Sequence, residues 1–442
     1  MKPSKLASTE KDGLGTLSVL SIGIGGMVGG GIFAVTGLTI ELTRGAAPVA
    51  FIVAGIVAFL TAYSYLKLTL TYPGQGGTVE FLNRAYGTGI FTGSANILLG
   101  LSYVVLLAIY AFAFGSYGAN LFPKASYLLW QHTLITGVII LLTIINLVGA
   151  HLVVRSENFF NVTKMLLLAV FIVVGLATPL KMEHLSLTEY VPVWGIVSGA
   201  MIIFLNYEGF ELIANASPDV KTPGKSLPVA YLGGVLLVIV FYALIAVTVI
   251  GHLSFATVSK DADYALAVAA QSFWGRPGFL MIVIAALLAT SSAINATLYG
   301  AGRLTYVIAK TGELPSELER GLFHEHPEGM IIFAILALLI ANFLPLHAIA
   351  TMGSAGFLLI FMAVNVANIR LAVSTRSKAW ISGLGALACG IALLALCWQV
   401  WQDPATRSQL WILAGMIALS FVIEATYRAV TGREIHLGHH RV

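Results

Sequence analysis

Two stretches of this sequence place helix-breaking glycines and polar side chains inside long apolar segments. The first holds six glycines in the nine positions 23–31, and Gly29, Gly30 and Gly31 are consecutive. Each glycine costs a helix roughly 1 kcal/mol relative to alanine. A close helix crossing would explain spaced glycines such as Gly25 and Gly29. Three in a row instead predict a broken helix, and exposed backbone is tolerated at membrane depth only beside protein or a water-filled cavity.

The second stretch, 193–212, carries Asn206, Glu208 and Glu211 well inside an apolar segment. A carboxylate at the bilayer centre costs about 2.5–3.5 kcal/mol even on the mildest scale, so it marks a functional interior position by default. The alternative is that either glutamate pairs with a neighbouring helix as structural support. Glu208 directly precedes Gly209, which favours an unwound segment there; for Glu211 both interpretations stay open.

The composition shows which environment these stretches occupy. The chain has 442 residues, of which 58% are hydrophobic and 10% are charged, whereas soluble domains carry about 25% charged residues. The chain is therefore an integral membrane protein. Cys389 and Cys397 indicate no disulfide framework and no metal site. The polar first 13 residues do not resemble a removable signal peptide. We expect no cofactor and no nucleic-acid partner, and the sequence does not indicate an oligomeric state.

Twelve apolar segments are long enough to span a bilayer, each needing about 20 residues. They lie at 14–41, 46–71, 89–121, 130–150, 158–180, 193–216, 228–252, 276–310, 329–346, 348–373, 380–401 and 409–430. Only Pro345 and His347 mark the separation between the ninth and the tenth. With twelve spans, 17 Lys and Arg residues lie on the face that holds both termini and six on the opposite face. The positive-inside rule then places both termini in the cytoplasm of a cell whose cytoplasmic membrane holds the protein.

The two interrupted segments hold matching positions, first and sixth, in two groups of five spans. Paired glycine-interrupted segments of this kind indicate the midplane site of a transporter. We expect a cytoplasmic tail at 1–13, a first five-helix repeat at 14–180 and a second at 193–373. Two further helices follow at 380–430, with a cytoplasmic tail at 431–442.

Three motifs, in order along the chain, resemble the amino acid–polyamine–organocation permeases. The first runs from Ile24 through the glycines to Ile32 and Phe33, and the second from Phe204 through Tyr207-Glu208-Gly209-Phe210-Glu211 to Thr222-Pro223. The third runs from Ser291 to Arg303 and on to Gly312-Glu313-Leu314-Pro315. The resemblance implies an all-α, LeuT-like 5+5 inverted repeat with broken first and sixth helices, and transport of amino acids or related amines. Two departures are Gly30, where many relatives have serine, and Thr78-Val79, which replaces a tyrosine-containing loop.

The resemblance also implies how a zwitterion would be held. The N–H groups of Gly29, Gly30 and Gly31, at the positive end of a half-helix, would bind its carboxylate. The carbonyls of Met27 and of the stretch from Leu205 to Glu208 would accept its ammonium. Phe204, Tyr207 and Phe210 are candidates to cap the substrate, although core packing explains them equally well. Tyr103 and Tyr110 are weaker candidates, for which packing is favoured.

Lys164 lies six residues inside the predicted span 158–180. Its side chain either snorkels to the cytoplasmic surface or occupies the place where sodium-coupled relatives of this fold hold their ion. In the second case it contacts carbonyls near Gly23 and Gly26 and the hydroxyl of Ser291 or Ser292, in a cation site near Glu211. A buried lysine can lose its proton, so Lys164 could couple transport to protons, as the resemblance also implies. Ser292, Ala296 and Gly300 also fit a small-residue packing pattern.

The leading hypothesis is a secondary amino acid transporter, either proton-coupled or an exchanger, working by alternating access. The alternative is a carrier of polyamines or organic amines, and a membrane receptor that senses its substrate without transporting it is a weaker hypothesis. Glu208 bears on this choice: aimed at the substrate side chain it favours cationic substrates, and protonated or turned away it tolerates neutral ones. An enzyme is disfavoured because no span combines a nucleophile with His and a carboxylate, or presents metal-ligand pairs.

Overall fold

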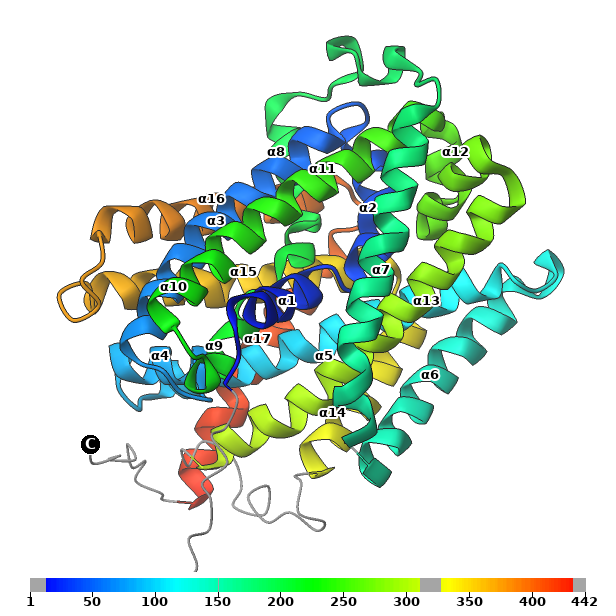
Figure 1. Ribbon diagram of the computed structural model, residues 1–442. Coiled ribbons are helices and arrows are strands. Elements are labelled where there is room, and N and C mark those ends of the chain that lie inside the picture. The colour runs from blue at the N-terminus through cyan, green and yellow to red at the C-terminus, as the bar shows by residue number, and fades with distance from the viewer. Residues whose placement is uncertain (1–12, 150, 311–326, 432–442) are drawn as a thin grey trace, which may run out of the picture.

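The computed structural model describes residues 13–149, 151–310 and 327–431, and every element within them is a helix (Figure 1). Nine of the helices are long and apolar enough to cross a membrane. They are α3 (Ala47–Thr71), α5 (Ile90–Ala119), α6 (Tyr127–Gly149), α7 (His151–Ala177), α11 (Gly234–His252), α13 (Ala265–Lys310), α15 (Leu346–Arg370), α16 (Ala379–Gln402) and α17 (Ser408–Thr431). The chain is a multi-pass, all-helical membrane protein.

Two further apolar segments are broken helices. The first consists of α1 (Thr16–Met27) and α2 (Gly31–Thr43), which meet at an angle of 48°. In the second, α8 (Val193–Ile202) is bent by 54° relative to the segment Phe204–Asp219. That segment contains η4 (Phe204–Tyr207), α9 (Leu212–Ala216) and η5 (Ser217–Asp219). The breaks occur where the glycines and the buried carboxylates predict them, so this expectation is confirmed.

The remaining helices are shorter. The apolar helix α14 (Pro327–Phe343) is separated from α15 at Pro345, as predicted. α10 (Pro223–Pro228) leads through the π-helical turn η6 (Val229–Gly233) into α11. The others lie in the connections between the predicted spans: α4 (Gly77–Tyr86), α12 (Phe255–Lys260), η1 (Lys124–Ser126), η2 (Met182–Leu185), η3 (Leu187–Glu189) and η7 (Ala262–Tyr264).

Two of the predicted segments begin well before their expected first residue in the structure. α7 starts at His151, upstream of the expected 158. α13 starts at Ala265 rather than 276, because a short helix joins it through Gly275, whose φ of 65° changes the direction of the chain. Gly275 is followed by Arg276 and Pro277, so the predicted boundary marks this change of direction and not the start of the helix.

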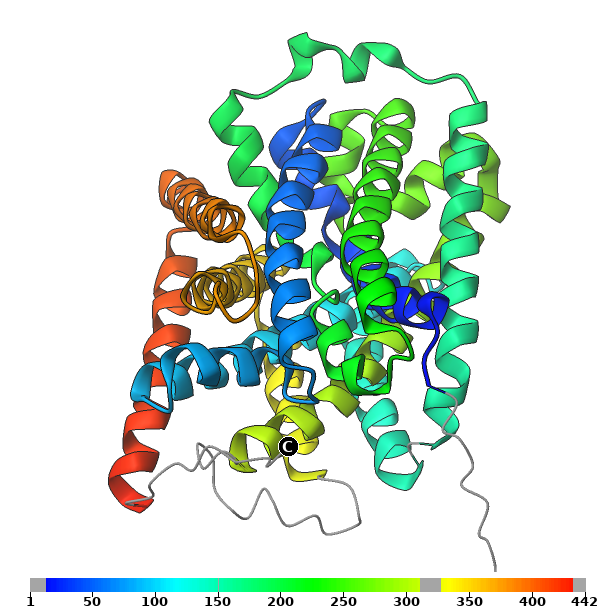
Figure 2. The same ribbon diagram turned by 60° about the vertical axis from the view of Figure 1, so that its left-hand side comes forward.

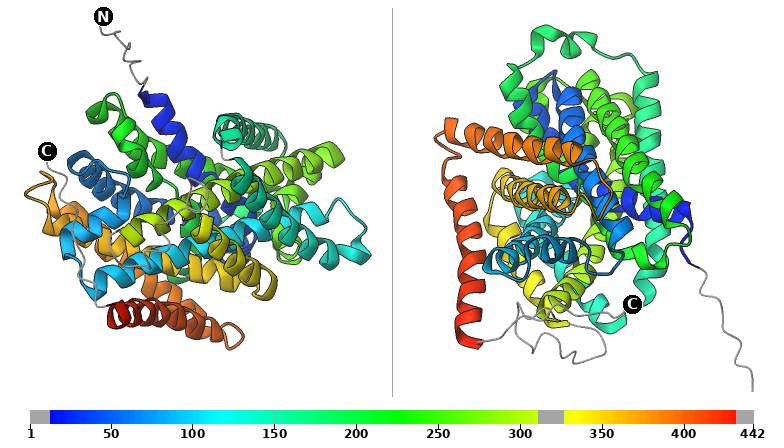
Figure 3. Two further views of the ribbon diagram at one scale, coloured as in Figure 1. Left: turned by 90° about the horizontal axis from the view of Figure 1, so that it is seen from below. Right: turned by 90° about the vertical axis from the view of Figure 1, so that its left-hand side faces the viewer.

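The position of each helix in the bundle follows from its burial. α5 and α15 are the most buried of the long helices, whereas α17 is the least buried and lies at the edge of the bundle (Figures 2 and 3). Large apolar side chains cover the outward faces of α6, α7, α16 and α17, for example Leu128, Phe159, Leu394 and Trp411. Such exposed surface is suited to lipid.

The two ends of the bundle differ. At one end, residues 178–192 form an arch from α7 to α8 (Figure 2). At the other, the segment before α1 pairs with the segment after η5. The N–H of Leu14 donates to the Asp219 carbonyl at 2.7 Å, and the N–H of Lys221 donates to the Leu14 carbonyl at 3.1 Å. These bonds join the start of the first broken helix to the end of the second.

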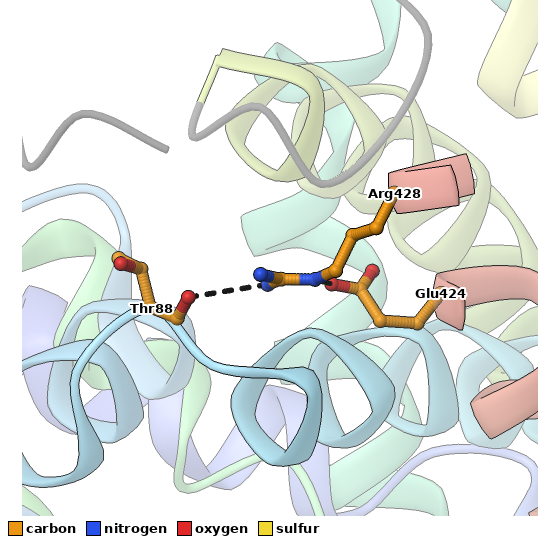
Figure 4. A network of polar contacts seen from close by, with 3 residues as sticks. All are labelled: Thr88, Glu424 and Arg428. Carbon is orange, nitrogen blue, oxygen red and sulfur yellow. Dashed lines mark hydrogen bonds and ion pairs between the residues drawn. The ribbon is translucent and has the colours of Figure 1, made fainter. Parts of the chain in front are cut away.

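Arg428, whose side chain is only partly buried, attaches α17 to the α4–α5 connection (Figure 4). Arg428 pairs with Glu424 one turn earlier in α17, and its Nη2 donates to the Thr88 carbonyl at 3.2 Å. Gly93 of α5 permits the approach, because a Cβ there would lie 2.2 Å from the Glu424 carboxyl group. This bond adds to the packing of α17 on α5 and α15.

Candidate functional site

The first broken helix leaves backbone amides without acceptors. α1 ends at Met27, and the N–H of Val28 makes the last bond of that helix, to the Ile24 carbonyl. Gly29, Gly30 and Gly31 are buried. Within the described part of the chain, the N–H groups of these three glycines have no hydrogen-bond acceptor. Because they lie at the N-terminal end of α2, the helix dipole adds positive potential there.

The second broken helix turns at Glu208 and Gly209. Glu208 is extended, with φ −67° and ψ 154°, and Gly209 has a φ of +114°. L-residues rarely adopt that φ. The turn is held by Glu211, whose carboxylate accepts the Gly209 N–H at 2.6 Å and the Tyr103 hydroxyl at 3.1 Å. Glu211 therefore contacts a neighbouring helix, as its structural interpretation requires.

The two breaks lie against each other. A Cβ on Gly209 would lie only 2.2 Å from the backbone carbonyl carbon of Gly26, so both glycines are needed for the crossing. The Tyr242 hydroxyl of α11 donates to the Met27 carbonyl at 2.7 Å and contacts the Asn206 carbonyl at 3.2 Å. The close-crossing and broken-helix interpretations of the glycines are thus both correct, at different positions.

Asn206 and Glu208 are the polar anomaly of this crossing. Both are buried, with 2% and 1% of their surfaces exposed. The amide nitrogen and oxygen of Asn206 and both carboxyl oxygens of Glu208 lack a hydrogen-bond partner among the residues that the structure describes. Buried polar groups are almost always paired, so such a group calls for a functional explanation. If Glu208 supported a neighbouring helix, its carboxyl group would bond to that helix. No such bond is present among the described residues.

The predicted aromatic caps are core residues in this structure. Phe204, Tyr207 and Phe210 are each fully buried. Phe204 and Phe210 pack on Phe361, and the Tyr207 hydroxyl donates to the Phe51 carbonyl at 2.6 Å. Leu205 is also buried. These contacts correspond to the packing alternative.

Lys164 lies on α7 and points inward. Its side chain is 1% exposed, and Nζ donates to the Gly25 carbonyl at 2.9 Å. Gly25 belongs to the stretch 23–26 where the functional interpretation expects the contact. Because the side chain is buried, it does not snorkel to the surface. Gly23 packs on Ile213 of the second broken helix.

A cavity of about 480 Å³ ends at the crossing of the two breaks. Its deep part is formed by Gly25, Gly26, Gly209, Glu211, Tyr103 and Tyr110. It continues between α9 and α13 to Gln75, Asn215, Asp219 and Tyr299, at the end of the bundle opposite the 178–192 arch. Of the predicted site residues, the cavity lining includes Gly26, Glu211 and Ser292. Ser291 and the residues from Met27 to Gly31 and Phe204 to Glu208 lie outside it.

Ser292 lines the cavity together with Ala296 and Gly300, which share its face of α13. A Cβ on Gly300 would meet nothing within 4 Å, so this face does not pack closely against another helix there.

The residues that sequence reasoning undervalued are Tyr103 and Tyr110 of α5. Tyr110 also explains why position 30 is a glycine, where many relatives have serine. A Cβ on Gly30 would lie 2.7 Å from the Tyr110 ring and 2.7 Å from the Thr290 methyl group, so a side chain there would have to displace them. The seven-residue spacing of the two tyrosines places them on one helix face, but only the packing shows which face borders the cavity.

The comparisons with known proteins agree with this geometry. The amino acid permease family model matches residues 14–422. This chain belongs to the amino acid permease family. The permease is 33% identical to the inner membrane transport protein YbaT of Escherichia coli strain K12, over 93% of this chain and 95% of that protein.

More distant relatives carry names of different substrates. The permease is 27% identical to a methylthioribose transporter of Bacillus subtilis, over 84% of this chain and 82% of that protein. It is 22% identical to the branched-chain amino acid permease BcaP of Bacillus subtilis, with 91% of each chain covered. The family and these relatives are transporters, not enzymes. The permease therefore moves a small organic solute, of the amino acid class or a related one, across a membrane.

Proposed function

We propose that this permease is a secondary active transporter of amino acids in the cytoplasmic membrane. It would work by alternating access around a midplane site, with both termini cytoplasmic. Its twelve spans would form repeats at 14–180 and 193–373, followed by two helices at 380–430. The observation that carries the proposal is the cavity that ends at the crossing of two broken helices, the arrangement typical of transporter sites.

In this proposal the substrate carboxylate binds the amides of Gly29, Gly30 and Gly31. Those amides are buried at the N-terminal end of α2, where the helix dipole is positive. Their N–H groups have no acceptor among the described residues. The ammonium binds backbone carbonyls of Met27 and of the stretch from Leu205 to Glu208. The Met27 carbonyl already accepts the Tyr242 hydroxyl, and a carbonyl oxygen has two lone pairs, so one remains for the substrate.

We propose that Lys164 couples transport to protons. The buried contact between Nζ and the Gly25 carbonyl supports this role, because it places a titratable amine on the half-helix that borders the cavity. Deprotonation would remove the charge that holds α7 to α1. Protonation of Lys164 and the position of α1 would then depend on each other.

Uptake into liposomes tests both parts of this proposal. Purified permease should accumulate labelled amino acids, and an inward proton gradient should increase the accumulation. Lys164→Ala should keep exchange between internal and external substrate but lose the response to the gradient. The absence of any uptake by the natural protein would refute the transport proposal. A Lys164→Ala variant that responds to the gradient like the natural protein would refute the coupling role.

A carrier of cationic amino acids or polyamines is the second candidate. The observation that favours it is the buried Glu208 carboxyl beside Glu211, which has no hydrogen-bond partner among the residues that the structure describes. An ionised carboxylate in such a place costs several kcal/mol unless a cation neutralises it. A substrate with a second amine would supply that cation.

A further inference from the structure

Tyr110 is an exception among the buried tyrosines of this permease. The described chain buries six: Tyr65, Tyr110, Tyr117, Tyr207, Tyr231 and Tyr242. Five of their hydroxyls bond to protein partners, which are Thr78, Phe33, Phe51, Thr69 and Met27. The Tyr110 hydroxyl has no hydrogen-bond partner among the described residues. Because Tyr110 lines the cavity, this hydroxyl is available to a ligand there.

The position of the Tyr110 side chain indicates which ligand group it meets. The residue lines the deep part of the cavity, and its ring lies against Gly30. Its hydroxyl lies 3.3 Å from the point where a Cβ of Gly29 would stand. The Tyr110 side chain therefore borders both the cavity and the first break. A ligand that approaches those amides from the cavity meets the Tyr110 hydroxyl.

The packing also disfavours a side-chain hydroxyl at position 30. Tyr110 and Thr290 both approach a Gly30 Cβ within 2.7 Å. A serine there would have to displace the aromatic ring and the threonine methyl group. Any side-chain donor near these amides must therefore come from another helix, and Tyr110 of α5 is in place to be that donor.

We propose that the Tyr110 hydroxyl donates a hydrogen bond to the substrate carboxylate, beside the amides of the first break. This inference rests on the proposed function, because it requires that the substrate be an amino acid. Tyr110 is then a residue that distinguishes amino acids from the corresponding amines. A phenol is suited to this role because it donates a hydrogen bond without adding charge.

The test compares substrates with and without a carboxylate. Tyr110→Phe removes the hydroxyl but keeps the ring that packs on Gly30. We expect the concentration of alanine or leucine needed for half-maximal inhibition of uptake to rise roughly 10- to 100-fold, the effect of losing a hydrogen bond to a charged group. Ethylamine and isopentylamine, which lack the carboxylate, should inhibit the variant and the natural protein equally. The maximal rate should change much less than the half-saturating concentration.

Tyr117→Phe is the matched control, since it removes a buried hydroxyl two turns further along α5, outside the cavity lining. It should leave the affinity for amino acids unchanged. Unaltered affinity in Tyr110→Phe would overturn the inference. An equal loss for amino acids and amines would also overturn it, because the hydroxyl would then serve the ammonium or the fold. If the natural protein transported no amino acid at all, the proposed function would fail, an outcome visible before any variant is made.

Discussion

At the scale of single residues, the site combines groups that lack partners with groups that have them. Glu211 is fully engaged by Gly209 and Tyr103, so it stabilises the turn of the second broken helix. Glu208, three residues earlier, bonds to nothing that the structure describes. Two carboxyl groups at similar depth thus have different environments, and Glu208 is the one free to respond to the charge of a substrate.

The prediction at this scale concerns Glu208→Gln, which removes the charge and keeps the shape. If a substrate cation neutralises Glu208, lysine, arginine and putrescine should inhibit the variant at least about 10-fold more weakly than the natural protein. Alanine and leucine should inhibit both proteins alike. Competition assays in liposomes measure this. Failure of the cations to compete in the natural protein, where neutral amino acids do compete, would exclude Glu208 as a selectivity residue.

At the scale of elements, the two broken helices depend on a close backbone crossing. Gly209 faces Gly26 with no room for a Cβ, and its φ of +114° strains any other residue. Tyr242 joins the two breaks from α11. Each break therefore stabilises the other, and neither half-helix pair keeps its geometry alone.

The prediction at this scale is that Gly209→Ala destabilises the permease. Backbone strain of this kind costs about 1–3 kcal/mol, and the contact with Gly26 adds to it. The melting temperature in detergent should fall and uptake should be lost. Gly137→Ala on α6 is the control, since a Cβ there meets nothing within 4 Å; it should melt at or above the natural temperature. A Gly209→Ala protein with normal stability and uptake would show that the crossing is not required.

At the scale of the whole molecule, the cavity extends from the crossing toward one end of the bundle, as its lining among the described residues shows. Its lining continues to Gln75 and Asn215, while the arch of residues 178–192 lies at the other end. With the proposed orientation, this is a conformation open to the cytoplasm. Alternating access requires a second conformation in which the crossing is reached from the other side.

The prediction at this scale is one-sided labelling. In a background with Cys389 and Cys397 replaced by serine, Asn215→Cys should react with a membrane-impermeant thiol reagent applied from the cytoplasmic side, and substrate should slow the reaction. Thr188→Cys, on the exposed arch, should react only from the outside. The same sidedness for both variants would contradict the assignment of the two ends.

The sequence by itself determined most of the long apolar elements. Apolar length located the nine long helices and separated α14 from α15 at Pro345, and the clustered glycines and carboxylates located both breaks, because these features act locally. It could not anticipate the amphipathic α4 in a connection or the change of direction at Gly275, where a short helix continues the pattern.

Only the tertiary structure decided which side chains meet. It buried Lys164 against Gly25, placed Phe204 and Tyr207 in the core, and brought Tyr110 rather than a residue at position 30 to the cavity. These outcomes depend on which face each helix turns toward residues distant in sequence. An apolar helix surrounded by lipid and protein has weak amphipathicity, so its sequence carries little record of that choice.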